Sequence, residues 1–235
     1  MSLPIPNSPI FTVKLLSVKD PVKFKPFTVL EEKIFLIAEE GGDEKEILYA
    51  IRQVLSNCCV SKIDVNKLPL FDVEYFFLQL RAKSVSNIST VKYRDNEDNI
   101  VRDFDIDLDS IVPIENPNHK TSFKLTDTMA VNFKYPTIED LLGVQNLKIN
   151  DLETAIETIS VCLDVIVDGE EVYEASNYSR EEKIDFINGL STKQFEGIVE
   201  TFVETMPKMQ HIIKYVNALG NDREIILEGF RSFFQ

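Results

Sequence analysis

Residues 71–83 read FDVEYFFLQLRAK, and they form the most apolar helical pattern in this 235-residue chain. Val73, Phe76, Phe77 and Leu80 recur at intervals of three and four residues, which places them on one face of an α-helix. A helix that is apolar on most of its sides lies either at the centre of a core or under a partner protein. This segment is therefore predicted to be the structural centre of the fold.

Two further helices are predicted on the N-terminal side of this segment. In the first of them, Leu30, Ile34 and Ile37 repeat at helical spacing. Asp43 with Glu46 resembles a capping box, which begins a helix by satisfying its first backbone N–H groups. The second helix then has one clean apolar face, made by Ile47, Leu48, Ile51, Val54, Leu55 and Cys58.

Short antiparallel hairpins are predicted in four places. Strand-like stretches with polar turns occur at residues 10–27, at 88–94 with 100–111, at 120–135, and at 209–216 with 223–228. In the second of these, Phe104, Ile106 and Leu108 alternate with aspartates, which is the period of two that a strand with one buried face requires.

The part of the chain between Pro136 and the last hairpin is predicted to be mostly helical. One helix is expected to have an apolar face made by Leu152, Ile156, Ile159 and Leu163. Helix starts are predicted by three capping-box pairs, which are Asn150 with Glu153, Ser179 with Glu182, and Ser191 with Gln194.

The predicted fold class is therefore α+β, with amphipathic helices packed with short antiparallel β-hairpins. A linker at residues 113–119 (PIENPNH) is the plausible boundary. It divides the chain into an N-terminal α+β region, 1–112, and a mostly helical region, 113–235, that ends in a β-hairpin and a short aromatic helix. A single domain is the alternative, because a chain of this length suits one or two domains.

The formal net charge of −14 restricts the partners. Such a surface repels phosphate backbones and anionic lipid head groups, so no nucleic acid is expected as a partner, whereas a protein with basic patches is. No run of about 18 apolar residues is present, so no membrane span is expected. Cys58, Cys59 and Cys162 are an odd number in apolar surroundings, which favours core packing in a reducing, intracellular compartment.

Residues that could carry chemistry are few. His119 lies in the linker and His211 lies in an apolar stretch, and neither is next to a catalytic motif. The aspartate row from Asp105 fails as a calcium loop, because Ser110 and Asn116 occupy the sixth and twelfth positions where glycine and glutamate are required. Glycine-rich phosphate loops and paired zinc-binding cysteines are also absent from the sequence. No catalytic residue, cofactor or metal is predicted, and an enzyme is not expected.

Four segments, in order along the chain, resemble the T-even-type bacteriophage family of baseplate hub assembly proteins. They are residues 25–38 (KPFTVLEEKIFLIA), 71–85 (FDVEYFFLQLRAKSV), 136–142 (PTIEDLL), and the C-terminal pattern of Met206-Pro207, 226–230 (ILEGF) and Phe233-Phe234. Lys25 stands where arginine is usual in the family. Some members carry cysteine pairs in the hairpin turns, and this chain has none there, which puts a metal-stabilised ribbon in doubt.

The resemblance implies a role in building the central hub of a contractile-tail baseplate, and it implies no catalytic residues. The predicted function is a non-enzymatic, chaperone-like assembly factor that binds hub or tape-measure proteins in the host cytoplasm during phage assembly. The alternatives are a structural hub subunit that stays in the virion baseplate and, from another class, a hydrolase whose site forms only in three dimensions. Homo-oligomerisation is left open.

A partner-binding surface is predicted from an acidic strand face and the aromatic C-terminus. Its residues are Asp103, Asp105, Asp107, Asp109, Phe230, Phe233 and Phe234. Four like charges on one strand repel one another, and a basic partner would relieve that repulsion. Terminal phenylalanines must pack against something, since chain ends otherwise fray. The alternatives are a solvated strand face for the aspartates and packing into the protein's own core for the phenylalanines.

Overall fold

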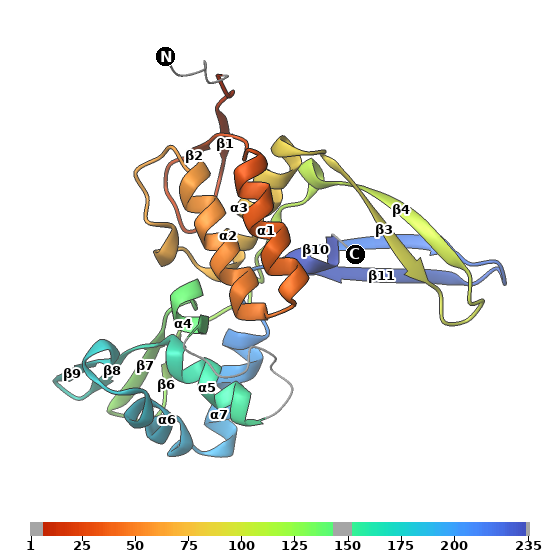
Figure 1. The fold of residues 1–235 in the computed structure, drawn as a ribbon. Helices are drawn as coiled ribbons and strands as arrows, with labels where there is room; N and C mark the ends of the chain where they lie inside the picture. Colours follow the sequence, from red (N-terminus) through yellow and green to blue (C-terminus); the bar gives the residue numbers. More distant parts are fainter. Residues whose placement is uncertain (1–6, 143–151, 234–235) are drawn as a thin grey trace, which may run out of the picture. The chain divides into compact units, whose positions relative to one another are not determined.

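The computed structural model describes residues 7–142 and 152–233. Helices and small antiparallel sheets make up the chain, which confirms the α+β class (Figure 1). Residue contacts group the chain into two compact units, Met1–Ile114 with Lys208–Gln235, and Glu115–Pro207. The predicted boundary lies beside the first of these junctions. However, the predicted division placed the last hairpin in the second region, whereas its contacts group it with the first.

Three helices form the helical part of the first unit. They are α1 (Val29–Gly41), α2 (Glu44–Cys58) and α3 (Leu70–Ser84). The side chain of Asp43 accepts a hydrogen bond from the backbone N–H of Lys45 at 2.8 Å, so Asp43 caps α2 as predicted. A short hairpin of β1 (Phe11–Val13) and β2 (Val22–Phe24) precedes the helices.

Helix α3 is the centre of this unit, as its sequence predicted. Val73, Phe76, Phe77 and Leu80 are at most 1 % exposed. The ring of Phe76 packs edge-on against a strand residue, Phe24, with 5.5 Å between centroids. These contacts show that α3 holds the neighbouring elements together through its apolar face.

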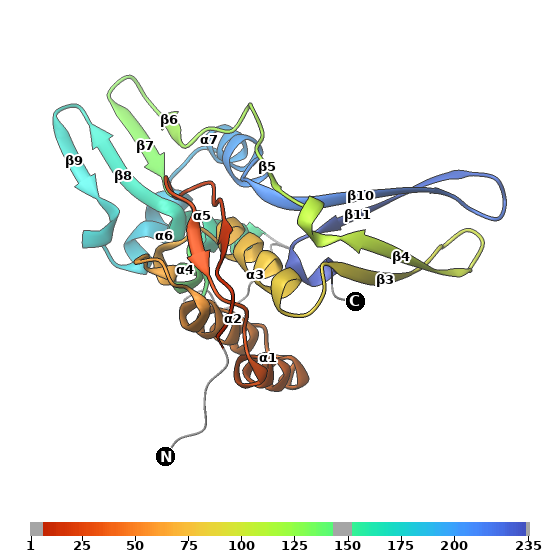
Figure 2. The ribbon, with the colours of Figure 1, turned by 90° about the horizontal axis from the view of Figure 1, so that it is seen from above.

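Two longer hairpins belong to the same unit and confirm two of the predicted ones. The first joins β3 (Ile88–Arg94) to β4 (Val101–Asp107), and the second joins β10 (Lys208–Val216) to β11 (Asp222–Glu228). Figures 1 and 2 show them side by side, extending away from the three helices. A short strand, β5 (Pro113–Ile114), pairs with the start of β10.

The second unit is a four-stranded antiparallel sheet with helices. The strands pair in the order β6 (Ser122–Lys124), β7 (Met129–Phe133), β8 (Leu163–Asp168) and β9 (Glu171–Glu174). The helices are α4 (Ile138–Leu142), α5 (Leu152–Cys162), α6 (Arg180–Asn188) and α7 (Thr192–Ile198). Both described capping boxes, at Ser179 and at Ser191, are present as predicted. Asn150 lies outside the described residues.

The hairpin of β8 and β9 corrects the expectation of a helix that carries Leu163 on its face. Helix α5 ends at Cys162, and Leu163 begins a strand. The β-branched run of β8 leads into Asp168-Gly169, where Gly169 adopts a φ of 60°. A left-handed glycine after aspartate is a strong hairpin-turn signal, and it overrides the helical spacing of the preceding residues.

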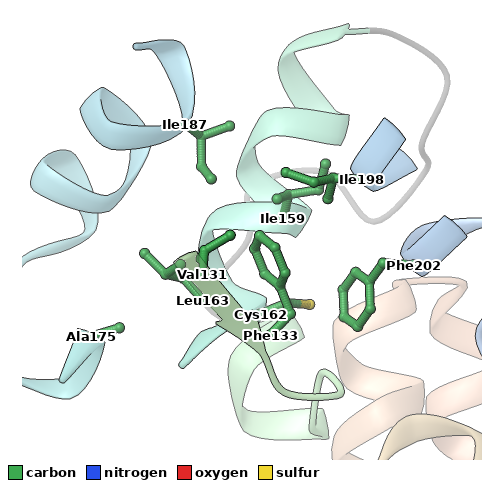
Figure 3. Packing of buried hydrophobic residues seen from close by; sticks show 9 residues of the cluster. All are labelled: Val131, Phe133, Ile159, Cys162, Leu163, Ala175, Ile187, Ile198 and Phe202. Carbon is green, nitrogen blue, oxygen red and sulfur yellow. The ribbon is translucent and has the colours of Figure 1, made fainter. Parts of the chain in front are cut away.

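The core of the second unit lies between the sheet and its helices. Figure 3 shows its buried members, which are Val131, Phe133, Ile159, Cys162, Leu163, Ala175, Ile187, Ile198 and Phe202. The rings of Phe133 and Phe202 stack with 5.1 Å between centroids. Strand β7 and the π-helical turn η4 (Val199–Val203) therefore contact each other through these two aromatic side chains.

Candidate partner-binding surfaces

The acidic strand face exists in the fold and is exposed. Asp103, Asp105 and Asp107 project from one face of β4, while Ile106 on the opposite face is 2 % exposed. Asp109 follows in the short helix η2 (Leu108–Ser110) and is also exposed. The structure therefore brings all four predicted aspartates to the surface of the first hairpin.

The four aspartates differ in what they do locally. Asp107 accepts a hydrogen bond from the backbone N–H of Asp109 at 3.1 Å and so caps η2. Asp109 forms an ion pair with Lys83 of α3 at 2.7 Å. Asp105 accepts a hydrogen bond from the Thr90 hydroxyl at 2.7 Å, and Asp103 lies across from a lysine on β3. Asp103 and Asp105 cap no helix, so they are the two aspartates of this face that are best placed to bind a partner.

Phe233 does not join this surface in the way that was predicted. Phe233 is fully buried, and its backbone carbonyl accepts a hydrogen bond from the hydroxyl of Ser89. A side chain with no exposed area has nothing to offer a partner, so the core alternative describes Phe233. The side chain of Phe230 and the whole of Phe234 lie outside what the structure describes.

The turns of the two long hairpins are joined by a polar cluster that the sequence did not reveal. We call it the turn clasp, and it consists of Asp95, Glu97, Asp98, Arg102, Tyr215, Asn217 and Arg223. Arg223 Nη1 donates to Glu97 Oε1 at 2.7 Å, and the Tyr215 hydroxyl donates to the buried carboxylate of Asp95. The backbone N–H of Ala218 donates to Asp98 at 2.9 Å.

The electrostatics of the turn clasp keep Asp95 and Asp98 ionised. The hydrogen bond from Tyr215 holds the pKa of Asp95 below its usual range, with help from backbone N–H groups and from Arg223. The hydrogen bond from Arg102 does the same for the pKa of Asp98. Above the ring of Tyr215, Arg102 adds a cation–π contact at 5.4 Å. The clasp therefore ties both hairpin ends into one structure at neutral pH.

The two histidines lie in different surroundings. His211 is a half-buried residue of β10, opposite Leu227. His119 stacks on the ring of Tyr135 at 5.4 Å, and its Nδ1 lies 2.8 Å from the Thr205 hydroxyl. That hydroxyl donates its proton to the carbonyl of Thr201 at 2.6 Å, so Nδ1 must be the donor in the first bond. The neutral ring then carries its lone pair on Nε2, which is buried and has no hydrogen-bond partner within residues 7–142 and 152–233.

This arrangement predicts a loss of stability at mildly acidic pH. Burial lowers the pKa of His119 below its ordinary value of 6.5, so the unfolded chain takes up the proton first. The unit 115–207 should keep its full stability above that value and lose stability as the pH falls from there towards the lowered pKa. Urea unfolding at about pH 7 and pH 5.5 measures this loss.

The His119→Gln variant separates this effect from the titration of carboxylates. Glutamine cannot take up a proton, so the variant should lose less stability than the native chain between the two pH values. Equal losses would show that His119 is not the source. His119 lines an open pocket together with Lys120 and Glu200. These two charged residues are the same in the variant and in the native protein, so they do not cause a difference between them.

Comparison with known proteins places the chain in a family. The family model described as T4 bacteriophage base plate protein matches residues 8–235. The chain belongs to this baseplate family. No curated protein and no solved structure matches it. The match confirms the resemblance to T4-type phage baseplate proteins, and a baseplate protein is expected to have a structural or assembly role rather than an enzymatic one.

The thiols of this baseplate protein are poor nucleophiles. Burial raises the pKa of Cys58 to about 12, and it raises the pKa of Cys162 to about 12 as well. A thiol with so high a pKa is almost fully protonated at neutral pH. Over the described part of the chain, no group of three or more His, Cys, Asp or Glu residues could hold a metal ion, and no helix is long and apolar enough to cross a membrane.

Proposed function

We propose that this baseplate protein is a non-enzymatic, chaperone-like factor in assembly of the baseplate hub. It binds hub or tape-measure proteins in the host cytoplasm before the baseplate closes. Family membership over nearly the whole chain supports a role in the baseplate. The observation that carries the binding role is the exposed acidic face of β4, held on a hairpin whose turn is fixed by the turn clasp.

An acidic face on a fixed scaffold suits transient binding. Complementary charge speeds encounter and selects a partner, while contributing less to the lifetime of the complex. A factor that must leave after assembly needs this combination. The same charge makes nucleic acid and anionic membranes unfavourable partners.

Counting molecules in purified phage particles tests the assembly role. We expect quantitative mass spectrometry to find the protein abundant in infected-cell extracts and far below hub stoichiometry in finished virions. Co-purification from those extracts should recover hub or tape-measure proteins. Retention in virions at the stoichiometry of a hub subunit would replace the transient factor with the structural alternative.

Charge reversal tests the acidic face itself. The variant Asp103→Lys with Asp105→Lys should weaken partner binding by roughly tenfold at low salt, since each exposed pair contributes about 0.2–1 kcal/mol and reversal adds repulsion. The effect should shrink as salt rises, because charges are screened over about 8 Å at physiological ionic strength. Surface plasmon resonance against the co-purified partner measures it.

The control carries the same change of charge elsewhere. Asp127→Lys with Asp164→Lys alters two exposed aspartates of the second unit. It should leave binding and its salt dependence unchanged. If both double variants weaken binding equally, net charge rather than the β4 face is responsible, and the assignment of this face is wrong.

A further inference from the structure

Helix α1 carries apolar side chains on a face that the first unit does not cover. Val29, Leu30, Leu36 and Ile37 are 80, 64, 49 and 59 % exposed. Residues seven apart are two helical turns apart and share a face, so the four form one strip, which we call the α1 stripe. Figures 1 and 2 show α1 on the outer side of the three helices.

The opposite face of α1 already supplies the packing that holds the helix. Ala38 is buried, and Phe35 packs against Phe77 of α3 with 5.1 Å between ring centroids. The α1 stripe is therefore not needed for attachment of α1 to its own unit. Four large exposed apolar side chains in one strip are more than the scattered single ones that are usual on a protein surface.

A groove continues the α1 stripe across the helices. It has a volume of about 570 Å³ including its open mouth, and its lining includes Phe35, Val54 and Phe77. Leu36 belongs to both the stripe and the groove, and Val85, which is 53 % exposed, lies on the groove as well. Stripe and groove thus form one continuous apolar surface on the first unit.

Acidic groups border this surface. Glu31 and Glu32 line the groove together with one cation, Arg81, and Glu40 is exposed at the other end of α1. Partial burial acts to raise the pKa of Glu31, but hydrogen bonds from Thr28 and Asn57 outweigh it and hold that pKa below its usual value. Two carboxylates and one guanidinium line the groove, so its formal charge is net negative.

This charge decides which partner fits. A second copy of the chain would bring the same glutamates and the same net charge of −14 to the contact, and like charges facing each other are destabilising. A partner with lysine or arginine beside its apolar residues would instead form favourable pairs. Two turns of exposed helix, about 12 Å, match the spacing at which a partner helix presents apolar anchors.

We propose that the α1 stripe and its groove bind an amphipathic helix of another phage protein, one with apolar anchors at helical spacing and basic residues beside them. Lys33 lies between the two halves of the stripe and is exposed. A polar residue within an apolar helix contact fixes its register at some cost in stability, so the partner carries a polar or acidic residue there. This inference rests on the proposed function, since it names the chemistry of what the assembly factor holds.

A synthetic peptide tests the surface directly. The probe is a helix of about four turns with leucines at heptad core positions, lysines beside them and one central glutamate. Fluorescence anisotropy measures its binding to the full-length protein. It should bind at least tenfold more tightly than a scrambled peptide or a version with glutamate in place of every lysine. Equal binding of all three peptides would overturn the proposal.

Paired variants locate the binding. Leu36→Ser with Ile37→Ser should weaken peptide binding at least tenfold without lowering the melting temperature, because both side chains are exposed. The matched control is Val172→Ser with Ile226→Ser, which changes two apolar residues of similar exposure elsewhere and should leave binding intact. Unchanged binding in the first variant would overturn the proposal.

Sedimentation and phage assembly distinguish the remaining outcomes. If the protein alone forms a dimer, and the Leu36→Ser with Ile37→Ser variant is a monomer, then a second copy occupies the surface. That result would overturn the proposal. Phage that carry these changes should assemble fewer baseplates. Normal assembly with lost peptide binding would overturn this inference and leave the proposed function standing, whereas stoichiometric retention in virions would contradict the function alone.

Discussion

Replacing Phe77 with alanine is expected to lower the free energy of unfolding of the first unit by about 3–5 kcal/mol. Phe77 is 1 % exposed and packs against Phe35 of α1. Truncation removes the buried ring and leaves a cavity that α1, α2 and α3 cannot fill without moving. A loss of this size is a large part of the roughly 5–15 kcal/mol that stabilises a typical domain.

Urea unfolding followed by circular dichroism measures this loss, with Phe77→Leu and Phe11→Ala as controls. Leucine keeps most of the volume and should cost less than alanine. Phe11 is partly exposed on β1, so its truncation should also cost less. The loss is expected in the unfolding of the first unit, to which Phe77 belongs. Unchanged stability of the Phe77→Ala protein would show that this face of α3 is not part of the core.

The elements that the sequence predicts well are those with local signals. The apolar spacing of α3, the cap at Asp43 and the boxes at Ser179 and Ser191 all lie within a few residues of the structure they determine. The aspartates of β4 are predicted correctly as an exposed face because alternation along one strand is also local. These features could be read without knowledge of any distant contact.

Helix α1 shows where spacing fails. Leu30, Ile34 and Ile37 were expected to make one apolar face, yet Leu30 and Ile37 are exposed, while Ala38 is buried. The helix is apolar on most of its sides, so periodicity alone does not tell which side its neighbours take. The packing of Phe35 against Phe77 decides it, and that contact joins residues more than forty positions apart.

The turn clasp was missed for a related reason. Arg223 and Glu97 are 126 residues apart in sequence, and each looks like an ordinary turn residue by itself. The signal in the sequence was complementary charge in two turns. The turn from Asp95 to Asp98 is acidic, and the turn of the last hairpin is followed by Arg223. Complementary charge in two turns indicates a contact only when the two hairpins are already known to lie side by side.

Replacing Asp72 with alanine is expected to be the second large loss of stability. Asp72 is fully buried in the first turn of α3, and its two carboxylate oxygens accept hydrogen bonds from the backbone N–H groups of Leu16 and Ser17, each at 2.8 Å. Alanine leaves both donors without their acceptor. A hydrogen bond to a charged group contributes about 1.5–3 kcal/mol, and an unsatisfied buried donor costs about 1–3 kcal/mol.

Loss of the Asp72 carboxylate should loosen one connection, the one between the N-terminal hairpin and α3. Asp72 holds the segment between β1 and β2 onto α3, so hydrogen exchange should show faster exchange at Leu16 and Ser17 in the variant. Asp64→Ala is the matched control, because Asp64 also accepts a backbone hydrogen bond but is exposed, and its loss should cost about 1 kcal/mol or less. Asp72→Asn keeps one acceptor oxygen and turns an N–H donor towards the other backbone N–H, so it should remain well below the native protein in stability. If Asp72→Ala unfolds at the same urea concentration as Asp64→Ala, the buried carboxylate does not hold the N-terminal hairpin on α3.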